Sequence, residues 1–210
     1  MKTIYIIRHG TTIGMEQHIV QGSSDSPLSD KGLEEAQATA IALQKAGIQH
    51  IFTSPQRRAV QTAYIIANCI KVEPVLIDEL REMDFGKYEG MQRKTLQVAY
   101  HPFLYHFLQL MKYIHPKKYG ENLHAFRKRV HAGFEKILTH NQAQCFVLIG
   151  HTGTLWLLLS DLAKKHHFPF DKKVILKPCS ISKISVNNYG KTQIDYLNDI
   201  SHLSQPQAMT

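Results

Sequence analysis

Short apolar segments alternate with longer segments of helical periodicity, and this alternation most constrains how the chain of 210 residues can fold. Residues 3–7 and 145–149 are almost entirely apolar, which is typical of strands buried on both faces of a parallel sheet. Apolar side chains recur at helical spacing over 29–46 and 123–138, so we expect helices there. Strands that alternate with helices predict an α/β fold, a three-layer α/β/α sandwich around a mostly parallel central sheet.

The pattern of residues 48–77 predicts two more strands with a helix between them. Residues 48–53 form a short strand candidate, and 72–77 an edge strand because Pro74 interrupts it. Between them, Ser54 followed by Pro55 predicts the start of a helix, with Ser54 as the N-cap and Pro55 at the first helical position.

The end of the chain predicts a hairpin over residues 181–186 and 192–197, followed by a frayed tail from about residue 201. We find no internal repeat, low-complexity segment or linker, so we expect a single domain over residues 1–210. A hydrophobic content of 43% and a charged content of 20% exclude a disordered chain.

Three observations predict a cytoplasmic protein without a membrane segment. The longest strongly apolar run, residues 154–162, is far shorter than the ~20 residues that span a bilayer. Residues 1–7 lead too quickly into Arg8 to be a signal peptide. The three cysteines have no close pair and predict neither a zinc site nor a disulfide framework: Cys69, Cys145 and Cys179.

The charge balance is basic, with 25 Lys plus Arg against 17 Asp plus Glu and a formal net charge of +8. Nucleic acid, an anionic membrane surface or small phosphorylated substrates would each suit such a balance. The basic residues are spread along the chain, and no long basic run or aromatic-interleaved recognition motif occurs. We therefore expect no nucleic-acid and no membrane partner, and we interpret most of these charges as a solvated surface.

The first apolar strand ends directly in Arg8-His9-Gly10. In open α/β sheets, ligands bind outside the carboxyl ends of the strands, which is where this tripeptide falls. Arg8 suits bidentate binding of a phosphoryl group, and Gly10 allows the backbone to approach a ligand closely. His9 has the chemistry of a nucleophile or a general base. Taken alone, His9 is better explained as a strand-end histidine that caps a turn.

The strand at 145–149 repeats this design, because Gly150-His151-Thr152 follows it at the start of a helix. Backbone N–H groups at that helix start, the Thr152 hydroxyl and a protonated His151 would all bind phosphate oxygens. We expect the two histidine segments to converge on one pocket.

A helix start also follows the strand at 48–53, and a helix N-terminus is itself an anion site. Arg58 lies in the first turn, where a cation opposes the helix dipole and is mildly unfavourable. An anion bound beside Arg58 explains its position, whereas Arg57 fits an arginine that extends into solvent.

The loop at residues 80–90 offers three candidate acids, Glu82, Asp84 and Glu89. A carboxyl group beside a bound phosphate can donate a proton near neutral pH. Each of the three, taken alone, is also explained as a solvated side chain. The sequence lacks the ligand spacings of common metal sites, so we expect neither a metal ion nor a cofactor.

Together these motifs resemble those of the histidine phosphatase superfamily, with the phosphoglycerate mutase-like fold. Four motifs occur in the family's order: Arg8-His9-Gly10-x-Thr12, Ser54-x-x-x-Arg58-Ala59-x-Gln61-Thr62-Ala63, Leu80-x-Glu82 with Gly86-x-x-Glu89-Gly90, and Gly150-His151. Gln21-Gly22 and Asp25-Ser26-Pro27-Leu28, followed by Gly32, fall between the first two. The resemblance covers residues 2–162, and the ordered set is far more specific than any one motif.

The resemblance implies that His9 is the nucleophile that forms a phosphohistidine and that Glu82 is the proton donor. It also implies that Arg8, Arg58 and His151 hold the phosphoryl group. The further residues that we expect to bind substrate or phosphate are Gly10, Thr12, Gln21, Gly22 and Thr152.

The chain departs from the family pattern at three places. Thr11 stands where Glu or Gln is frequent, and Met15 stands where Asn is common, which removes a polar group from the pocket. Gly120-Glu121-Asn122 replaces the frequent Gly-Glu-Ser.

The resemblance favours the phosphatase branch: a metal-independent phosphomonoester hydrolase acting on a small phosphorylated metabolite, such as a sugar phosphate or the nucleotide-loop precursor of cobalamin. Residues 85–90 are close to the Phe-Gly-x-Trp-Glu-Gly of that branch. The helical segment 92–121 is expected to pack over the site and set specificity. The alternatives are a cofactor-dependent phosphoglycerate mutase-type transfer, a catalytically weak phosphate-binding scaffold and, supported by net charge alone, a nucleic-acid binder.

Overall fold

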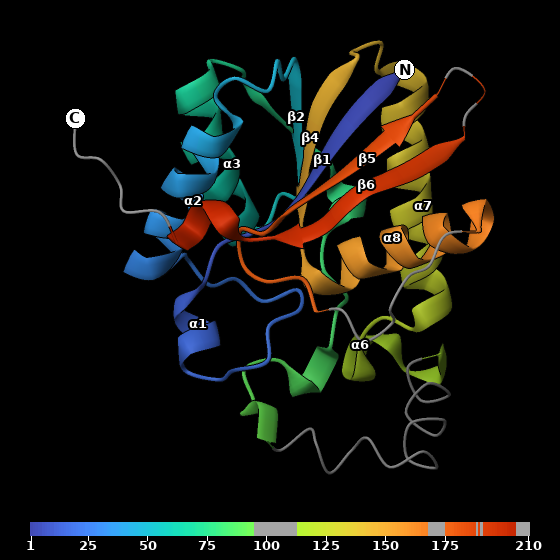
Figure 1. Cartoon of the computed structure of the whole chain (residues 1–210). Coiled ribbons are helices and arrows are strands. Elements are labelled where there is room, and N and C mark those ends of the chain that lie inside the picture. The colour runs from blue at the N-terminus through green and yellow to red at the C-terminus, as the bar shows by residue number, and fades with distance from the viewer. Residues whose placement is uncertain (95–112, 168–174, 188, 190, 205–210) are drawn as a thin grey trace.

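One six-stranded sheet lies at the centre of the described chain, and helices pack on both of its faces (Figure 1). The computed structural model describes residues 1–94, 113–167, 175–187, 189 and 191–204. The strands are β1 (Lys2–Arg8), β2 (His50–Thr53), β3 (Pro74–Leu76), β4 (Cys145–Gly150), β5 (Ile181–Val186) and β6 (Thr192–Asp199). The predicted α/β fold is confirmed.

The helices join the strands and cover the sheet. The α-helices are α1 (Ile13–Glu16), α2 (Asp30–Leu43), α3 (Arg57–Ile70), α6 (Pro116–Tyr119), α7 (Leu123–His140) and α8 (Thr152–His166). Short 3₁₀ helices are η1 (Asp78–Leu80), η2 (Gly86–Tyr88) and η4 (Ser201–Ser204). Among the described residues, no helix combines the length and the apolar character needed to cross a membrane.

The strand order is β3-β2-β4-β1-β5-β6. The four strands from β3 to β1 are parallel, whereas β5 pairs antiparallel with both β1 and β6. The predicted hairpin and the edge position of the strand containing Pro74 are therefore confirmed. Because β1 and β4 are neighbours in parallel register, with Arg8 opposite Gly150, their carboxyl ends lie side by side.

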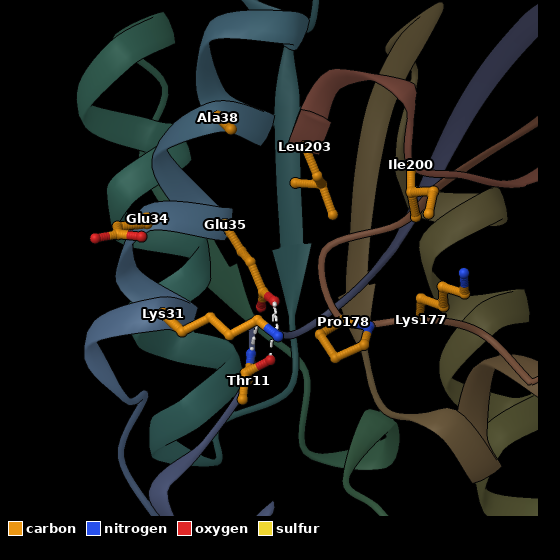
Figure 2. Close-up of a pocket in the computed structure, with 9 residues that line it drawn as sticks. All are labelled: Thr11, Lys31, Glu34, Glu35, Ala38, Lys177, Pro178, Ile200 and Leu203. Carbon is orange, nitrogen blue, oxygen red and sulfur yellow. Dashed lines mark hydrogen bonds and ion pairs between the residues drawn. The ribbon is translucent and has the colours of Figure 1, made fainter. Parts of the chain in front are cut away.

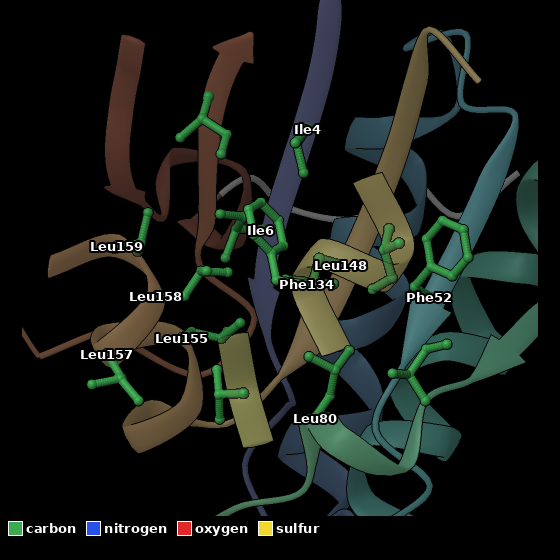
Figure 3. Packing of buried hydrophobic residues seen from close by; sticks show 14 of the residues in the cluster. Ile4, Ile6, Phe52, Leu80, Phe134, Leu148, Leu155, Leu157, Leu158 and Leu159 are labelled. Atoms are coloured by element: carbon green, nitrogen blue, oxygen red, sulfur yellow. The ribbon is translucent and has the colours of Figure 1, made fainter. Parts of the chain in front are cut away.

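The two central strands are apolar because helices cover both of their faces. On β4, Phe146 and Leu148 join the core beneath α7 and α8, whereas Val147 and Ile149 join the core beneath α2 and α3. Figure 3 shows the first of these cores, where Phe134 of α7 lies between the sheet and the helices. Successive side chains of a strand point to opposite faces, so an unbroken apolar run supplies both layers.

The helix expected from Ser54 begins later than predicted. Gln56 is the N-cap of α3, and the first helical residue is Arg57. Ser54 instead forms a turn, in which its hydroxyl accepts from the Gln56 backbone N–H at 3.3 Å and also contacts His151 at 2.8 Å. The Ser54 side chain is thus committed to the site, and the helix starts two residues after Pro55.

The predictions for the C-terminal tail and for the segment 92–121 are tested only in part by the described residues. The tail predicted to fray from about residue 201 begins instead as a 3₁₀ helix over Ser201–Ser204, in which Leu203 packs against the core around Ala36 and Cys179. The rest of that tail, residues 205–210, lies outside the described residues. Most of the segment 92–121 lies outside the described residues, and its described end forms α6.

Candidate active site

The carboxyl ends of β1 and β4 bring the two predicted histidines together. The backbone N–H of His9 donates to the carbonyl of Gly150 at 3.0 Å, which extends the parallel ladder by one residue. The imidazole rings of His9 and His151 lie 5.1 Å apart between centroids, tilted by 56°. The expected convergence of these segments is therefore seen, and it follows directly from strand register.

His9 is buried, with 4% of its surface exposed, and its Nδ1 lies 2.8 Å from the Gly10 carbonyl oxygen. Because a carbonyl can only accept, Nδ1 carries the proton and Nε2 keeps its lone pair. Burial, followed by the nearby charges of Arg8 and Arg58, holds the pKa of His9 well below its usual value. His9 is therefore a neutral imidazole at pH 7.

Arg58 and His151 form a buried chain of hydrogen bonds. Arg58 Nε donates to His151 Nδ1 at 3.2 Å, so the ring proton of the neutral His151 lies on Nε2, which contacts the Ser54 hydroxyl. The two terminal nitrogens of Arg58 donate to the carbonyls of Gly22 at 2.7 Å and Ser24 at 2.8 Å. This network fixes the guanidinium plane.

The electrostatic environment corrects one expectation about His151. Burial, followed by the charge of Arg58, holds the pKa of His151 well below its usual value. The protonated imidazole expected from the sequence is therefore disfavoured in this arrangement, and the Nε2–H of neutral His151 donates to the Ser54 hydroxyl.

Arg8 lines the same cavity, and one of its three guanidinium nitrogens has no hydrogen-bond partner among the described residues. Nη1 donates to the Leu176 carbonyl at 2.6 Å, Nη2 lies 3.4 Å from the Met15 sulfur, and the buried Nε has no partner in the described structure. Burial lowers the pKa of Arg8 to about 10, and the charge of Glu82 opposes this shift. Arg8 is therefore still a cation at neutral pH and can donate to an anion.

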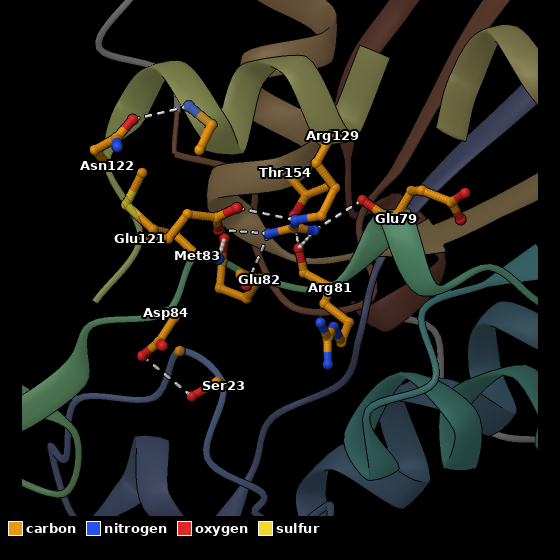
Figure 4. Close-up of polar contacts among 12 residues, drawn as sticks. Ser23, Glu79, Arg81, Glu82, Met83, Asp84, Glu121, Asn122, Arg129 and Thr154 are labelled. Atoms are coloured by element: carbon orange, nitrogen blue, oxygen red, sulfur yellow. Dashed lines mark hydrogen bonds and ion pairs between the residues drawn. The ribbon is translucent and has the colours of Figure 1, made fainter. Parts of the chain in front are cut away.

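Glu82 is the one candidate acid of its loop that faces the pocket. Its Oε2 accepts from the Gly153 backbone N–H at 2.8 Å, and its Oε1 accepts from the Met83 N–H at 2.9 Å. The Glu82 backbone N–H donates to Gln56 Oε1 at 2.8 Å, so the loop is tied to the start of α3. Figure 4 shows Glu82 beside Met83 and Arg81.

The other two acids of the loop serve its folding. Asp84 accepts from the Gly86 N–H at 2.6 Å, and Glu89 accepts from the backbone N–H groups of Ser23 and Ser24. Burial acts to raise the pKa of Glu89, but its hydrogen bonds with Ser24, Ser23 and Phe85 outweigh burial, and the pKa is lowered. Glu89 is therefore a fixed carboxylate that holds two loops together.

A cavity of about 770 Å³ joins these groups. The predicted site residues that line it are Arg8, His9, Gln21, Arg58, Glu82 and Thr152. The others lie behind this wall, His151 among them: it is 1% exposed and accepts from Arg58 Nε. Thr12 holds Gln21 through a 2.8 Å hydrogen bond, the Gly22 carbonyl accepts from Arg58, and the Gly10 N–H donates to the Thr62 hydroxyl. The Gln21 side-chain nitrogen is buried and has no hydrogen-bond partner in the described structure.

Sequence reasoning missed several residues of this cavity. One of them is a cation, Arg93. The others are mostly apolar and include Val20, Met83, Phe85, Phe126, Trp156 and Ile175, whereas Met15, which also lines the cavity, was already placed there by the family pattern. Gln56, which holds the Glu82 backbone, was also missed. The spacing of these residues carries no signal, because they come from widely separated parts of the chain.

A second cavity, of about 590 Å³, lies beside α2 and is drawn in Figure 2. There Glu35 accepts from the backbone N–H of Thr11 at 2.8 Å and from its hydroxyl at 2.9 Å. Thr11, which departs from the family pattern, thus anchors the segment that follows His9 to α2.

The fold and the site define an α/β protein whose strand ends place histidine and arginine side chains at one cavity. Residues 4–200 match the family model described as the histidine phosphatase superfamily (branch 1). The chain belongs to this superfamily, whose members react through a phosphohistidine. The predictions of a histidine phosphatase and of a phosphoglycerate mutase-like fold are confirmed.

Individual relatives agree with this assignment. A curated protein of Hydrogenobacter thermophilus, named "Putative phosphoserine phosphatase 2", is 29% identical over 98% of this chain and 99% of its own. The solved structure of Bacillus stearothermophilus YhfR has a TM-score of 0.81 at 25% identity, covering 97% of this chain and all of YhfR. A structure of phosphoglycerate mutase from Bacillus anthracis also has a TM-score of 0.81 at 25% identity, covering 96% of this chain and 95% of its own.

Proposed function

We propose that this chain hydrolyses phosphomonoesters of small metabolites, with His9 as the nucleophile and Glu82 as the general acid and base. The observation that carries the proposal is the state of His9: its Nδ1 is committed to the Gly10 carbonyl, and its ring lines a cavity shared with Arg58 and Glu82. The relative named as a phosphoserine phosphatase supports a phosphomonoester substrate.

In the first step, Nε2 of neutral His9 attacks phosphorus in line, and the bond from phosphorus to the leaving oxygen breaks. Protonated Glu82 gives its proton to that oxygen, so an alcohol leaves and a phosphohistidine forms. No proton needs to leave His9 before attack, because its lone pair is free and its pKa is lowered.

In the second step, ionised Glu82 takes a proton from a water molecule, whose oxygen attacks the phosphohistidine. The bond between nitrogen and phosphorus breaks, phosphate leaves, and both His9 and Glu82 return to their starting states. Division of the reaction into two displacements lets one carboxyl group act first as an acid and then as a base.

Fixed donors would stabilise the charge on the transferring phosphoryl group. Arg8 and Arg58 are held by backbone carbonyls, so they are oriented before substrate binds. Arg8 and Gln21 both line the cavity, and the Arg8 Nε and the Gln21 side-chain nitrogen, which have no partner in the described structure, are further donors. His151 acts behind them, because its Nδ1 accepts from Arg58 Nε and helps to hold that guanidinium. Such positioning and electrostatic stabilisation supply most of the catalysis in phosphoryl transfer.

The rest of the cavity favours a small organic leaving group. Apolar side chains such as Phe85 and Trp156 line it, and Arg93 adds a cation that can bind a second anionic group of the substrate. We keep the predictions that the enzyme works in the cytoplasm, needs no cofactor and has no nucleic-acid partner.

The proposal is tested by phosphate release from phosphoserine, sugar phosphates and p-nitrophenyl phosphate, with a chelator present throughout. In parallel, protein labelled from a ³²P substrate is quenched in alkaline denaturant, because phosphohistidine is labile in acid, and is assayed for phosphohistidine. We expect turnover and labelling in the wild type and neither in His9→Ala. Glu82→Gln should bind substrate but turn over about 10²–10⁴-fold more slowly.

The matched control is His124→Ala, because His124 is an exposed histidine of α7. Label in His9→Ala, or full activity in Glu82→Gln, would overturn the assignment of roles. Transfer of the phosphoryl group to a second metabolite in place of water would show a mutase. Phosphate binding without any turnover would show a scaffold.

A further inference from the structure

Arg129 of α7 converges on the backbone that carries Glu82, although it is not among the residues that line the cavity. Its Nη1 donates to the carbonyls of Glu79 at 2.8 Å and Arg81 at 3.0 Å, and its Nη2 lies 3.5 Å from the Glu82 carbonyl. Figure 4 shows the guanidinium between these carbonyls and Glu121. One side chain thus binds three carbonyls of the segment that leads into the proposed acid.

Glu121 holds the other edge of the same guanidinium. Arg129 Nε donates to Oε1 at 3.0 Å, and Nη2 donates to Oε2 at 2.6 Å, so the pair is bidentate. Both side chains are less than one-fifth exposed, at 19% for Arg129 and 17% for Glu121. A partly buried, bidentate pair restrains both position and plane more strongly than a single exposed contact does.

Contacts from other elements complete the restraint on Glu82. The Thr154 hydroxyl of α8 donates to the Arg81 carbonyl at 3.0 Å, and Gln56 accepts from the Glu82 N–H at 2.8 Å. The backbone N–H of Glu121 donates to the Asp84 carbonyl at 2.8 Å. The Arg129–Glu121 pair therefore holds the backbone on the α7 side, while Gln56 and Thr154 hold it from α3 and α8.

We propose that Arg129, oriented by Glu121, is a positioning residue that keeps the Glu82 carboxyl aimed at the leaving-group oxygen. The inference rests on the proposed function, in which Glu82 is the acid. Without the guanidinium, three carbonyls lose their donor and the Glu82 backbone can shift. A displacement of about 1 Å at a catalytic group costs roughly 10²-fold in rate.

The test exploits the leaving group, because a general acid matters most when the departing oxygen is strongly basic. We would measure kcat/KM of Arg129→Gln with an alkyl phosphate, such as glycerol phosphate, and with p-nitrophenyl phosphate. We use kcat/KM because it reports only the steps up to loss of the leaving group. The rate of phosphohistidine hydrolysis therefore does not affect it. We expect a loss of about 10²-fold with the alkyl ester and less than about threefold with the nitrophenyl ester.

The matched control is Arg127→Gln, since Arg127 lies on the same helix, is exposed, and pairs with Asp161 at 3.2 Å, away from the Glu82 loop. Arg127→Gln should leave kcat/KM unchanged with both esters. Arg129→Lys keeps the charge but loses the bidentate geometry, and we expect it to restore only part of the alkyl-ester activity. Circular dichroism and thermal unfolding verify that each variant is folded at the assay temperature.

A double variant separates this proposal from the proposed function. If Arg129 acts through Glu82, Arg129→Gln should add little further loss in a Glu82→Gln background. Equal losses with both esters, no loss with either, or full additivity would overturn the positioning role. If Glu82→Gln itself shows no dependence on the leaving group, the acid role of Glu82 fails instead. Should Arg129→Gln not fold, Glu121→Gln tests the same pair.

Discussion

Three arginines line the cavity, and their surroundings differ. Arg8 and Arg58 are buried and bind backbone carbonyls, which orients them toward a common position beside His9. Arg93 is exposed at the wall of the same cavity, close enough for its charge to lower the pKa of Arg8. In the proposed function, the buried pair binds the phosphoryl group, and we propose that Arg93 discriminates between leaving groups.

At the residue scale, we predict that Arg93→Gln lowers kcat/KM about tenfold for substrates with a carboxylate, such as phosphoserine, because a charge-assisted hydrogen bond is lost. p-Nitrophenyl phosphate has no second anionic group, so its kcat/KM should stay within about twofold. Steady-state assays of the wild type and Arg93→Gln with both substrates measure these kcat/KM values. Arg57→Gln serves as the control, since Arg57 is an exposed arginine that does not line the cavity. Equal losses with both substrates would contradict this role of Arg93.

At the scale of elements, the start of α7 explains a departure from the family pattern. Asn122 is the N-cap, and its side-chain oxygen accepts from the Ala125 backbone N–H at 2.9 Å. Asn and Ser satisfy the first free N–H groups of a helix equally well. Asn122 therefore does what the family's frequent serine would do, and it starts the helix directly after Glu121.

We predict that Asn122→Ala lowers the free energy of unfolding by about 1 kcal/mol, because the Ala125 N–H loses its acceptor. Asn122→Ser should leave the stability nearly unchanged. Urea unfolding of the three proteins, followed by circular dichroism, makes the comparison. A loss in Asn122→Ser as large as that in Asn122→Ala would show that the cap is not the cause.

At the scale of the whole molecule, the strand order buries two histidines at the centre of the sheet's carboxyl edge. His9 and His151 both have pKa values well below 6.5, because burial and Arg58 disfavour their charged forms. In the unfolded chain, these histidines regain ordinary pKa values near 6.5. Below that pH, the two histidines bind protons in the unfolded state but not in the folded state. The free energy of unfolding therefore falls as the pH falls.

We therefore predict a decline in unfolding free energy between pH 6.5 and 5.5, with each of these two histidines contributing at most about 1.4 kcal/mol per pH unit. Replacement of one of them, as in His9→Gln, should make the slope shallower by up to that amount. Replacement of the exposed His124 by Gln is the control and should leave the slope unchanged. Urea unfolding at pH 7.5, 6.5 and 5.5 measures the slopes. An unchanged slope in His9→Gln would refute the prediction.

Local patterns in the sequence determined most of the fold. Apolar runs placed β1 and β4, helical spacing placed α2 and α7, and the ordered motifs identified the superfamily. These signals are readable because burial on one or both faces of an element imposes a period on neighbouring residues. The order in which motifs follow the strands also indicated that His9 and His151 converge.

Only the tertiary structure decided how the site is held. It tied the Glu82 carboxylate to the Gly153 N–H, gave Ser54 to His151 rather than to a helix cap, and brought Arg129 to the Glu82 loop. The physical reason is that hydrogen bonds between distant segments depend on strand order and helix placement, and they leave no periodic trace in the chain. The neutral state of His151 has the same origin, because its burial and the nearby Arg58 exist only in the folded protein.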